Sequence, residues 1–184
     1  MVAAQSSRHP KGPRSNMATS VNQVLVSVAD RAAMFRLRGR ATAKESTGFK
    51  AAADGLRSRA LAHFVIDLTE CESMDSTFIG VLTGLSRRVH RDAGAAGKVE
   101  LVNPTAVVRR QLDDLFVLDQ FTVSECPLSP AGFEQVPAGP ANKVELCRLM
   151  LEAHQTLMDA NAANVPKFKQ VAEFLEEDLK NLGS

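Results

Sequence analysis

Short apolar runs of strand type alternate with longer segments of helical periodicity between residues 21 and 126. Two runs, at 24–28 and 35–37, place an apolar side chain at every second position. A period of two is typical of strands, so these runs predict a β-hairpin that turns at residues 29–32. Gly39 is predicted to end the second strand.

Helical and strand patterns then alternate along the chain. Residues 44–60 have an apolar period typical of a helix, and the nearly continuous apolar run at 63–68 predicts a strand covered on both faces. Two more helix–strand pairs follow, with helices at about 76–91 and from 103, and strands at 99–102 and 121–123. This order predicts an α/β fold, a mixed β-sheet with flanking helices.

The remaining segments surround this domain of residues 21–126. Residues 1–20 are rich in Ser, Arg, Pro and Gly and predict a disordered tail, and the Pro-rich stretch 127–140 predicts a linker. Residues 141–184 contain two amphipathic patterns separated by a break at 161–166, which predicts a C-terminal helical hairpin. Such a hairpin has to pack on the domain, on a second copy or on a partner.

Composition excludes several classes of protein. The net charge is +1 and the chain has nine Phe but no Trp or Tyr, which argues against a nucleic-acid surface. No window is apolar enough to span a membrane, and the N-terminus lacks the apolar core of a secretory signal. Three distant cysteines favour reduced thiols and a cytoplasmic location over disulfides or a zinc site.

Asp75, Ser76 and Thr77 form a polar cluster directly before an apolar helical pattern. Two hypotheses explain it. An Asp or Ser side chain here is typical of a helix N-cap, which needs no further function. Alternatively, Ser76 is a phosphorylation site, because a phosphate at a helix N-terminus meets backbone N–H groups and the positive end of the helix dipole. The added charge beside Asp75 would then repel a partner without unfolding the domain.

The motif and the order of elements resemble the STAS domain family. The matching residues are Ile66-Asp67-Leu68, then Met74-Asp75-Ser76-Thr77 with Gly80, and a second motif from Asn103-Pro104-Thr105 to Phe121. The resemblance covers residues 21–126. It implies a STAS-like fold and the function of a bacterial anti-sigma factor antagonist.

The resemblance also implies partners and a switch. An anti-sigma factor with serine kinase activity binds the unphosphorylated antagonist, phosphorylates the motif serine, here Ser76, and a metal-dependent serine phosphatase reverses the modification. Asp75, Thr77 and Met74 are then the expected partner-binding residues. Two departures from the family pattern stand out: Phe78 replaces a common Gly, and Gly39-Arg40-Ala41-Thr42 lacks the usual acidic pair.

A non-switching STAS scaffold or oligomerisation module remains the alternative, with homo-oligomers formed through the C-terminal helices. An enzyme is disfavoured, since no catalytic residues, metal ligands or cofactor motif assemble in the sequence, and the four His are scattered. Acidic neighbours are expected to raise the pKa of the Cys71 thiol, the reverse of an activated nucleophile. Gly80 and Gly84 are expected to let their helix approach the sheet closely.

Overall fold

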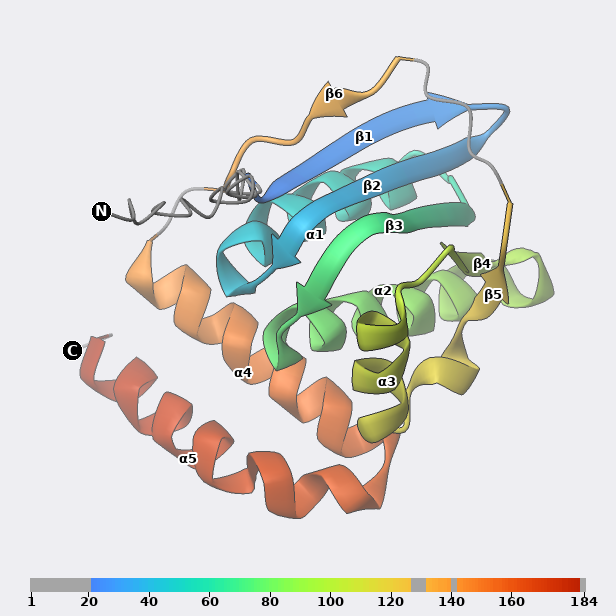
Figure 1. Cartoon of the computed structure of the whole chain (residues 1–184). Helices are drawn as coiled ribbons and strands as arrows, with labels where there is room; N and C mark the ends of the chain where they lie inside the picture. The colour runs from blue at the N-terminus through green and yellow to red at the C-terminus, as the bar shows by residue number, and fades with distance from the viewer. Residues whose placement is uncertain (1–20, 127–131, 140–141, 183–184) are drawn as a thin grey trace, which may run out of the picture.

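A computed structural model describes residues 21–126, 132–139 and 142–182. The predicted tail at 1–20 lies outside these residues. Within them, the strands form a six-stranded sheet of order β5-β4-β3-β2-β1-β6 (Figure 1). The strands are β1 (Gln23–Ala29), β2 (Ala32–Ala41), β3 (His63–Met74), β4 (Lys98–Val102), β5 (Thr122–Ser124) and β6 (Glu134–Gln135). The α-helices are α1 (Ala43–Ser58), α2 (Ser76–Ala93), α3 (Ala106–Asp114), α4 (Lys143–Ala160) and α5 (Val165–Leu182).

The predicted mixed α/β architecture with a C-terminal pair of helices is confirmed. β1 and β2 are antiparallel, whereas β2, β3, β4 and β5 pair in parallel, each joined to the next through a helix. The β1–β2 hairpin turns where expected, although it lacks an Asn-Gly pair. Asp30 and Arg31 both adopt positive φ angles, 49° and 66°, the conformation that matches a two-residue turn to the twist of its strands.

Two strand ends differ from the sequence prediction. β2 continues past Gly39 to Ala41, and β3 continues past Leu68 to Met74. The two extensions pair with each other, with register shifts on either side of the Arg38–Gly39 segment. Gly39 has a φ of +67°, and a glycine with this conformation inside a strand marks a bulge rather than an end.

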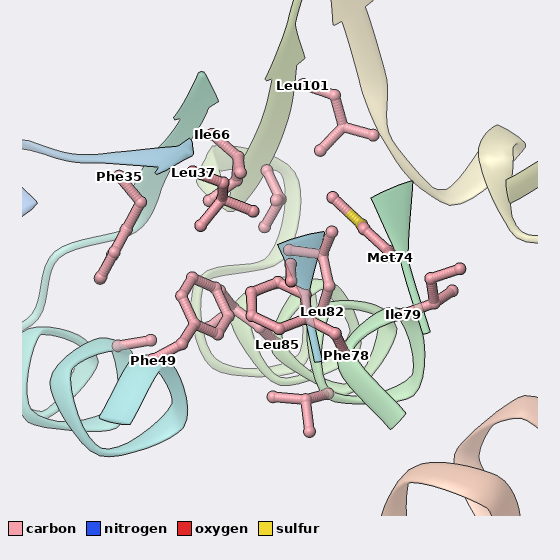
Figure 2. Close-up of a cluster of buried hydrophobic side chains, with 14 of the residues drawn as sticks. Phe35, Leu37, Phe49, Ile66, Met74, Phe78, Ile79, Leu82, Leu85 and Leu101 are labelled. Atoms are coloured by element: carbon pink, nitrogen blue, oxygen red, sulfur yellow. The ribbon is translucent and has the colours of Figure 1, made fainter. Parts of the chain in front are cut away.

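The hydrophobic core lies between the sheet and helices α1 and α2 (Figure 2). The ring of Phe49 contacts two other rings. Its centroid lies 4.9 Å from that of Phe35 and 5.1 Å from that of Phe78. They come from β2, α1 and α2, so three elements are joined by one aromatic row. Phe78, which replaces the glycine expected from the family pattern, is 0% exposed and completes this row.

Helix α4 extends the core on the outer side of α2, and α5 packs outside α4 (Figure 1). Leu149, Ala153 and Leu157 of α4 belong to the same buried cluster as the residues of the sheet. The turn between the two helices is also attached to the domain, because Nδ2 of the buried Asn164 donates to the carbonyl of Leu115 at 2.7 Å. The hairpin therefore packs on the domain, one of the three outcomes that its apolar stripes allow.

Part of the stretch expected to be a linker adds to the sheet. β6 pairs with β1, and the Val136 N–H donates to the Val24 carbonyl at 2.8 Å. Residues 127–131 and 140 of this stretch lie outside the described residues. Its described part is held against β1 by backbone hydrogen bonds, the usual way in which an added strand covers a sheet edge.

Candidate functional site

The Asp75 carboxylate accepts hydrogen bonds at the starts of two helices. Oδ1 accepts a hydrogen bond from the Phe78 N–H of α2 at 2.8 Å, and Oδ2 accepts from the Ala43 N–H of α1, also at 2.8 Å. Both donors belong to first turns, whose N–H groups have no partner within their own helix. The N-cap hypothesis is thus correct for Asp75 and does not involve Ser76.

The Ser76 hydroxyl contacts a histidine from the C-terminal helices. Ser76 is the first residue of α2 and is partly buried, and its Oγ lies 3.0 Å from Nε2 of His154 on α4. His154 is 4% exposed, and its ring stacks on Phe168 of α5 with centroids 5.0 Å apart. The serine is therefore joined through one side chain to both helices of the C-terminal hairpin.

Burial lowers the pKa of His154, against a weaker opposite effect of the Asp75 charge. The imidazole is accordingly neutral near pH 7, and its other nitrogen, Nδ1, is buried without a hydrogen-bond partner among the described residues. A neutral ring beside Ser76 offers no positive charge to a phosphate. The contact is suited to the unmodified hydroxyl.

The other predicted site residues lie close by but are covered. Met74 is 4% exposed and Thr77 is 3% exposed, so neither side chain presents appreciable surface in this arrangement. The Met74 N–H donates to the Gln111 side chain of α3 at 2.9 Å, which ties the end of β3 to that helix. The structure thus brings the four residues together, with only Asp75 and Ser76 partly exposed.

Gly80 lies one turn after Ser76 and faces α4, not the sheet. A Cβ atom built on Gly80 would lie 2.4 Å from the Ala153 carbonyl oxygen, so the two helices touch backbone to backbone. The expectation that this glycine lets α2 approach the sheet is therefore wrong. Its missing side chain gives room to a helix that lies 73 residues further along the chain.

Ion pairs flank the same contact. The Glu152 carboxylate on α4 lies 3.2 Å from Nη1 of Arg88 on α2 and 3.7 Å from Nζ of Lys50 on α1. Arg88 also contacts Asp54, at 3.5 Å. Between these two partners, Arg88 has only 18% of its side chain exposed.

The described residues contain no set of three His, Cys, Asp or Glu side chains placed to hold a metal ion. Burial, with a smaller effect of Glu72, raises the pKa of the Cys71 thiol to about 12. The direction agrees with the sequence expectation, although burial contributes more than the acidic neighbour. No helix of the described segments has the length and apolarity to cross a bilayer.

Comparison with known proteins assigns a family to the residues that form most of the sheet and helices α1 to α3. The family model described as "Mlab, STAS domain" matches residues 24–118, about half of the chain. The chain belongs to the STAS domain family. The sequence has no match among curated proteins.

Two solved structures share the fold of this STAS domain. A Thermotoga maritima protein assigned as an anti-sigma factor antagonist is 16% identical, with a TM-score of 0.50 over 56% of this chain and 86% of its own. The anti-sigma factor antagonist SpoIIAA in its unphosphorylated form is 18% identical, with a TM-score of 0.51 over 56% of this chain and 88% of its own. At these identities the likeness concerns the fold.

The family match ends before the C-terminal hairpin. Ser76 lies within the matched residues, whereas His154 and the rest of α4 and α5 lie outside them. Sequence reasoning missed His154 because it treated the histidines as scattered. The available signal was a titratable residue between Ala153 and Leu157, within the apolar stripe of an amphipathic helix.

Proposed function

We propose that this STAS domain is an anti-sigma factor antagonist whose binding is controlled by phosphorylation of Ser76. The unphosphorylated form binds an anti-sigma factor with serine kinase activity, and a metal-dependent serine phosphatase removes the phosphate. One observation supports this most directly. Because Asp75 supplies the cap, the Ser76 hydroxyl stands in the first turn of α2 without a capping role.

A phosphate on Ser76 would strongly change the charge of the surface at the start of α2. It adds up to about two negative charges beside Asp75, at a helix end whose dipole favours anions. A partner docked there would have to bury these charges, which is costly without matching cations. Asp75 shapes the partner contact by holding the starts of α1 and α2 together, and Met74 and Thr77 support that surface from beneath.

In this proposal the chain is a cytoplasmic binding protein, not an enzyme, and requires no cofactor. Catalysis belongs to the kinase and the phosphatase. The +1 net charge and the lack of Trp and Tyr give no reason to include nucleic acid among its partners.

Phosphate mapping in the native host tests the site. We expect peptide mass spectrometry of the full chain to find one phosphate on Ser76, absent from Ser76→Ala and retained in Ser73→Ala, a control three residues upstream. Strong phosphorylation of Ser76→Ala would show that the site is wrong.

Affinity capture from the same host tests the switch. We expect a kinase of the anti-sigma type to be recovered with the wild-type chain and lost with Ser76→Asp. Recovery of the same proteins by both would favour the second candidate, a non-switching STAS scaffold.

The scaffold alternative has a specific observation in its favour. Helix α5 exposes Phe174 (63% exposed) and Val171 (40% exposed), next to an apolar groove between α4 and α5. An oligomer formed through these helices would bury them. Sedimentation analysis of the full chain and of Phe174→Glu separates the candidates, because only an oligomer through this face would dissociate in the variant.

A further inference from the structure

We propose that the α4–α5 hairpin is a built-in competitor for the Ser76 surface: when docked it shields Ser76, and a partner gains access only when the hairpin lifts. This inference rests on the proposed function for its biological meaning. Its structural part, the shielding, stands on contacts within the chain.

The contact at Ser76 is the first step. Its Oγ lies 3.0 Å from Nε2 of a histidine that is itself 4% exposed. A protein kinase has to enclose the hydroxyl that it phosphorylates, and a phosphate adds three oxygens at that atom. With the imidazole at hydrogen-bond distance, both the enzyme and the phosphate need the space that His154 occupies.

The close approach of the helices is the second step. The backbones of Gly80 and Ala153 touch, so no side chain separates α4 from the start of α2 at this point. The surface of α2 from Ser76 to Gly80 is thereby occupied by a helix. Freed of α4, the same surface would present Ser76 and Gly80 to a partner.

Ion pairs and hydrogen bonds hold the hairpin in its docked position. Glu152 pairs with Lys50 and Arg88 on the flank, and Asn164 donates two hydrogen bonds, to the carbonyls of Leu115 and Leu157. The flank pair is half exposed at Glu152 (51%), where ion pairs are individually weak. The hairpin is thus held by the buried residues of α4 and by Asn164 at its turn, and more weakly by the ion pairs along its edge.

A short connection to β1 would keep the hairpin near the domain when it lifts from α2. Val136 is hydrogen-bonded to β1, and Lys143 begins α4 only seven residues later. A lifted hairpin remains linked over this short distance, so it competes at high effective concentration. A partner has to bind the exposed surface tightly enough to overcome this intramolecular competitor.

Thiol labelling of Ser76→Cys in the full chain tests the shielding without any kinase. Maleimide modification is followed at each cysteine by peptide mass spectrometry, with the partly exposed Cys126 as the internal reference. We expect the introduced thiol to react more slowly than Cys126, because His154 occupies the space beside the side chain at position 76. We expect Gly80→Ala, added to Ser76→Cys, to raise the rate at position 76 at least tenfold, while Gly55→Ala, whose Cβ meets nothing within 4 Å, leaves it unchanged.

A second opening variant, Glu152→Lys, keeps the test decisive if Gly80→Ala does not fold. It replaces the attraction to Lys50 and Arg88 with repulsion at an exposed position. We expect a severalfold rise at position 76. Labelling as fast as at Cys126 in the parent, or rates unchanged by the folded opening variants, would overturn the proposal.

Phosphate occupancy of Ser76 in the native host separates the two inferences. Higher occupancy in Glu152→Lys than in the parent supports the competitor. Equal occupancy in both overturns the shielding of the kinase site. If no variant carries a phosphate, phosphorylation control is rejected. If thiol labelling at position 76 still responds to Glu152→Lys, the conclusion that the hairpin covers this surface is kept.

Discussion

The two oxygens of the Asp75 carboxylate accept hydrogen bonds from different helices, from Phe78 in α2 and Ala43 in α1. One residue therefore satisfies a donor in the first turn of each helix, although the N-cap of α1 is Thr42. This arrangement also explains the polar cluster that precedes α2. Asp75 provides the cap, Thr77 is buried, and Ser76 is left to contact His154.

Replacing Asp75 tests the double cap. We expect Asp75→Ala to lower the free energy of unfolding by about 2 kcal/mol, since each lost cap costs about 1 kcal/mol. Asn142→Ala is the matched control, because Asn142 caps α4 alone, through the Val144 N–H, and should cost about 1 kcal/mol. Urea unfolding measures both. Equal losses would mean that the bond to α1 contributes nothing.

The buried His154 makes stability depend on pH. Because burial lowers its pKa in the fold, the unfolded chain binds more protons once the pH falls below the unfolded value of about 6.5. We expect the free energy of unfolding to decrease between pH 7.5 and 5.0, and to decrease less in His154→Asn. Identical pH dependence of the two proteins would contradict this assignment. Hydrogen bonds from Lys98 and Ser124 lower the pKa of Glu100 to about 2, so the stability that Glu100 contributes is lost only below about pH 4.5. Measurements that stop at pH 5 therefore exclude this second effect.

At the scale of elements, helix α2 is covered on two sides. One side buries Phe78, Leu82 and Leu85 in the core beneath the sheet. Another side, at Ser76 and Gly80, meets α4. A helix covered on two sides has little tolerance for added volume.

Glycine-to-alanine variants measure this difference. We expect Gly80→Ala to destabilise the chain by about 1–3 kcal/mol, because its Cβ would overlap the Ala153 carbonyl. Gly55→Ala, at an exposed position of α1, should stabilise it by about 0.5–1 kcal/mol through helix propensity. Thermal unfolding of the two variants gives the comparison. A stable Gly80→Ala would show that α4 yields easily.

A buried ion pair joins β2 to β3. Nε of Arg36 lies 2.7 Å from Oδ2 of Asp67, with side-chain exposures of 10% and 4%. Burial raises the pKa of Asp67, but hydrogen bonds from Thr69 and Arg36 outweigh it and lower the pKa. We expect Arg36→Met to cost about 3–5 kcal/mol by leaving this carboxylate unpaired, and Arg36→Met with Asp67→Leu to recover much of the loss. Chemical denaturation of both variants checks this, and a double variant no more stable than the single would refute it.

Most elements were predictable because their signals are local. The β1–β2 hairpin, the helical stripes and the C-terminal helices follow from periodicity within 10 to 20 residues. The extension of β3 to Met74 was missed because its outward side chains, such as Glu70 and Glu72, are polar and hide the strand pattern. This part of β3 is a strand because it pairs with β2, where Glu70 lies opposite Arg38, 32 residues earlier in the chain.

At the scale of the whole molecule, the C-terminal hairpin has an inner and an outer helix. α4 contributes Leu149, Ala153 and Leu157 to the common core, whereas α5 buries only Ala172 and Leu175, against α4. The extension beyond the family match is therefore part of one folded unit through α4. Stability should decrease outward from the sheet to α5.

Hydrogen exchange of the full chain measures this gradient. We expect amides of α5 to exchange faster than those of α4, and those of α4 faster than those of β3, because protection follows burial. Peptide-resolved mass spectrometry gives the rates. Equal protection of α5 and β3 would show that the outer helix unfolds only with the whole domain.

The sequence by itself determined the order of β1 to β5 and of the helices, the class of fold and the position of a cap before α2. These depend on short-range periodicity and on the chemistry of adjacent residues. Only the tertiary structure decided that Asp75 reaches α1, that Gly80 faces α4 and that His154, 78 residues from Ser76, meets its hydroxyl. Such meetings depend on how whole elements are seated in three dimensions, which no local pattern specifies.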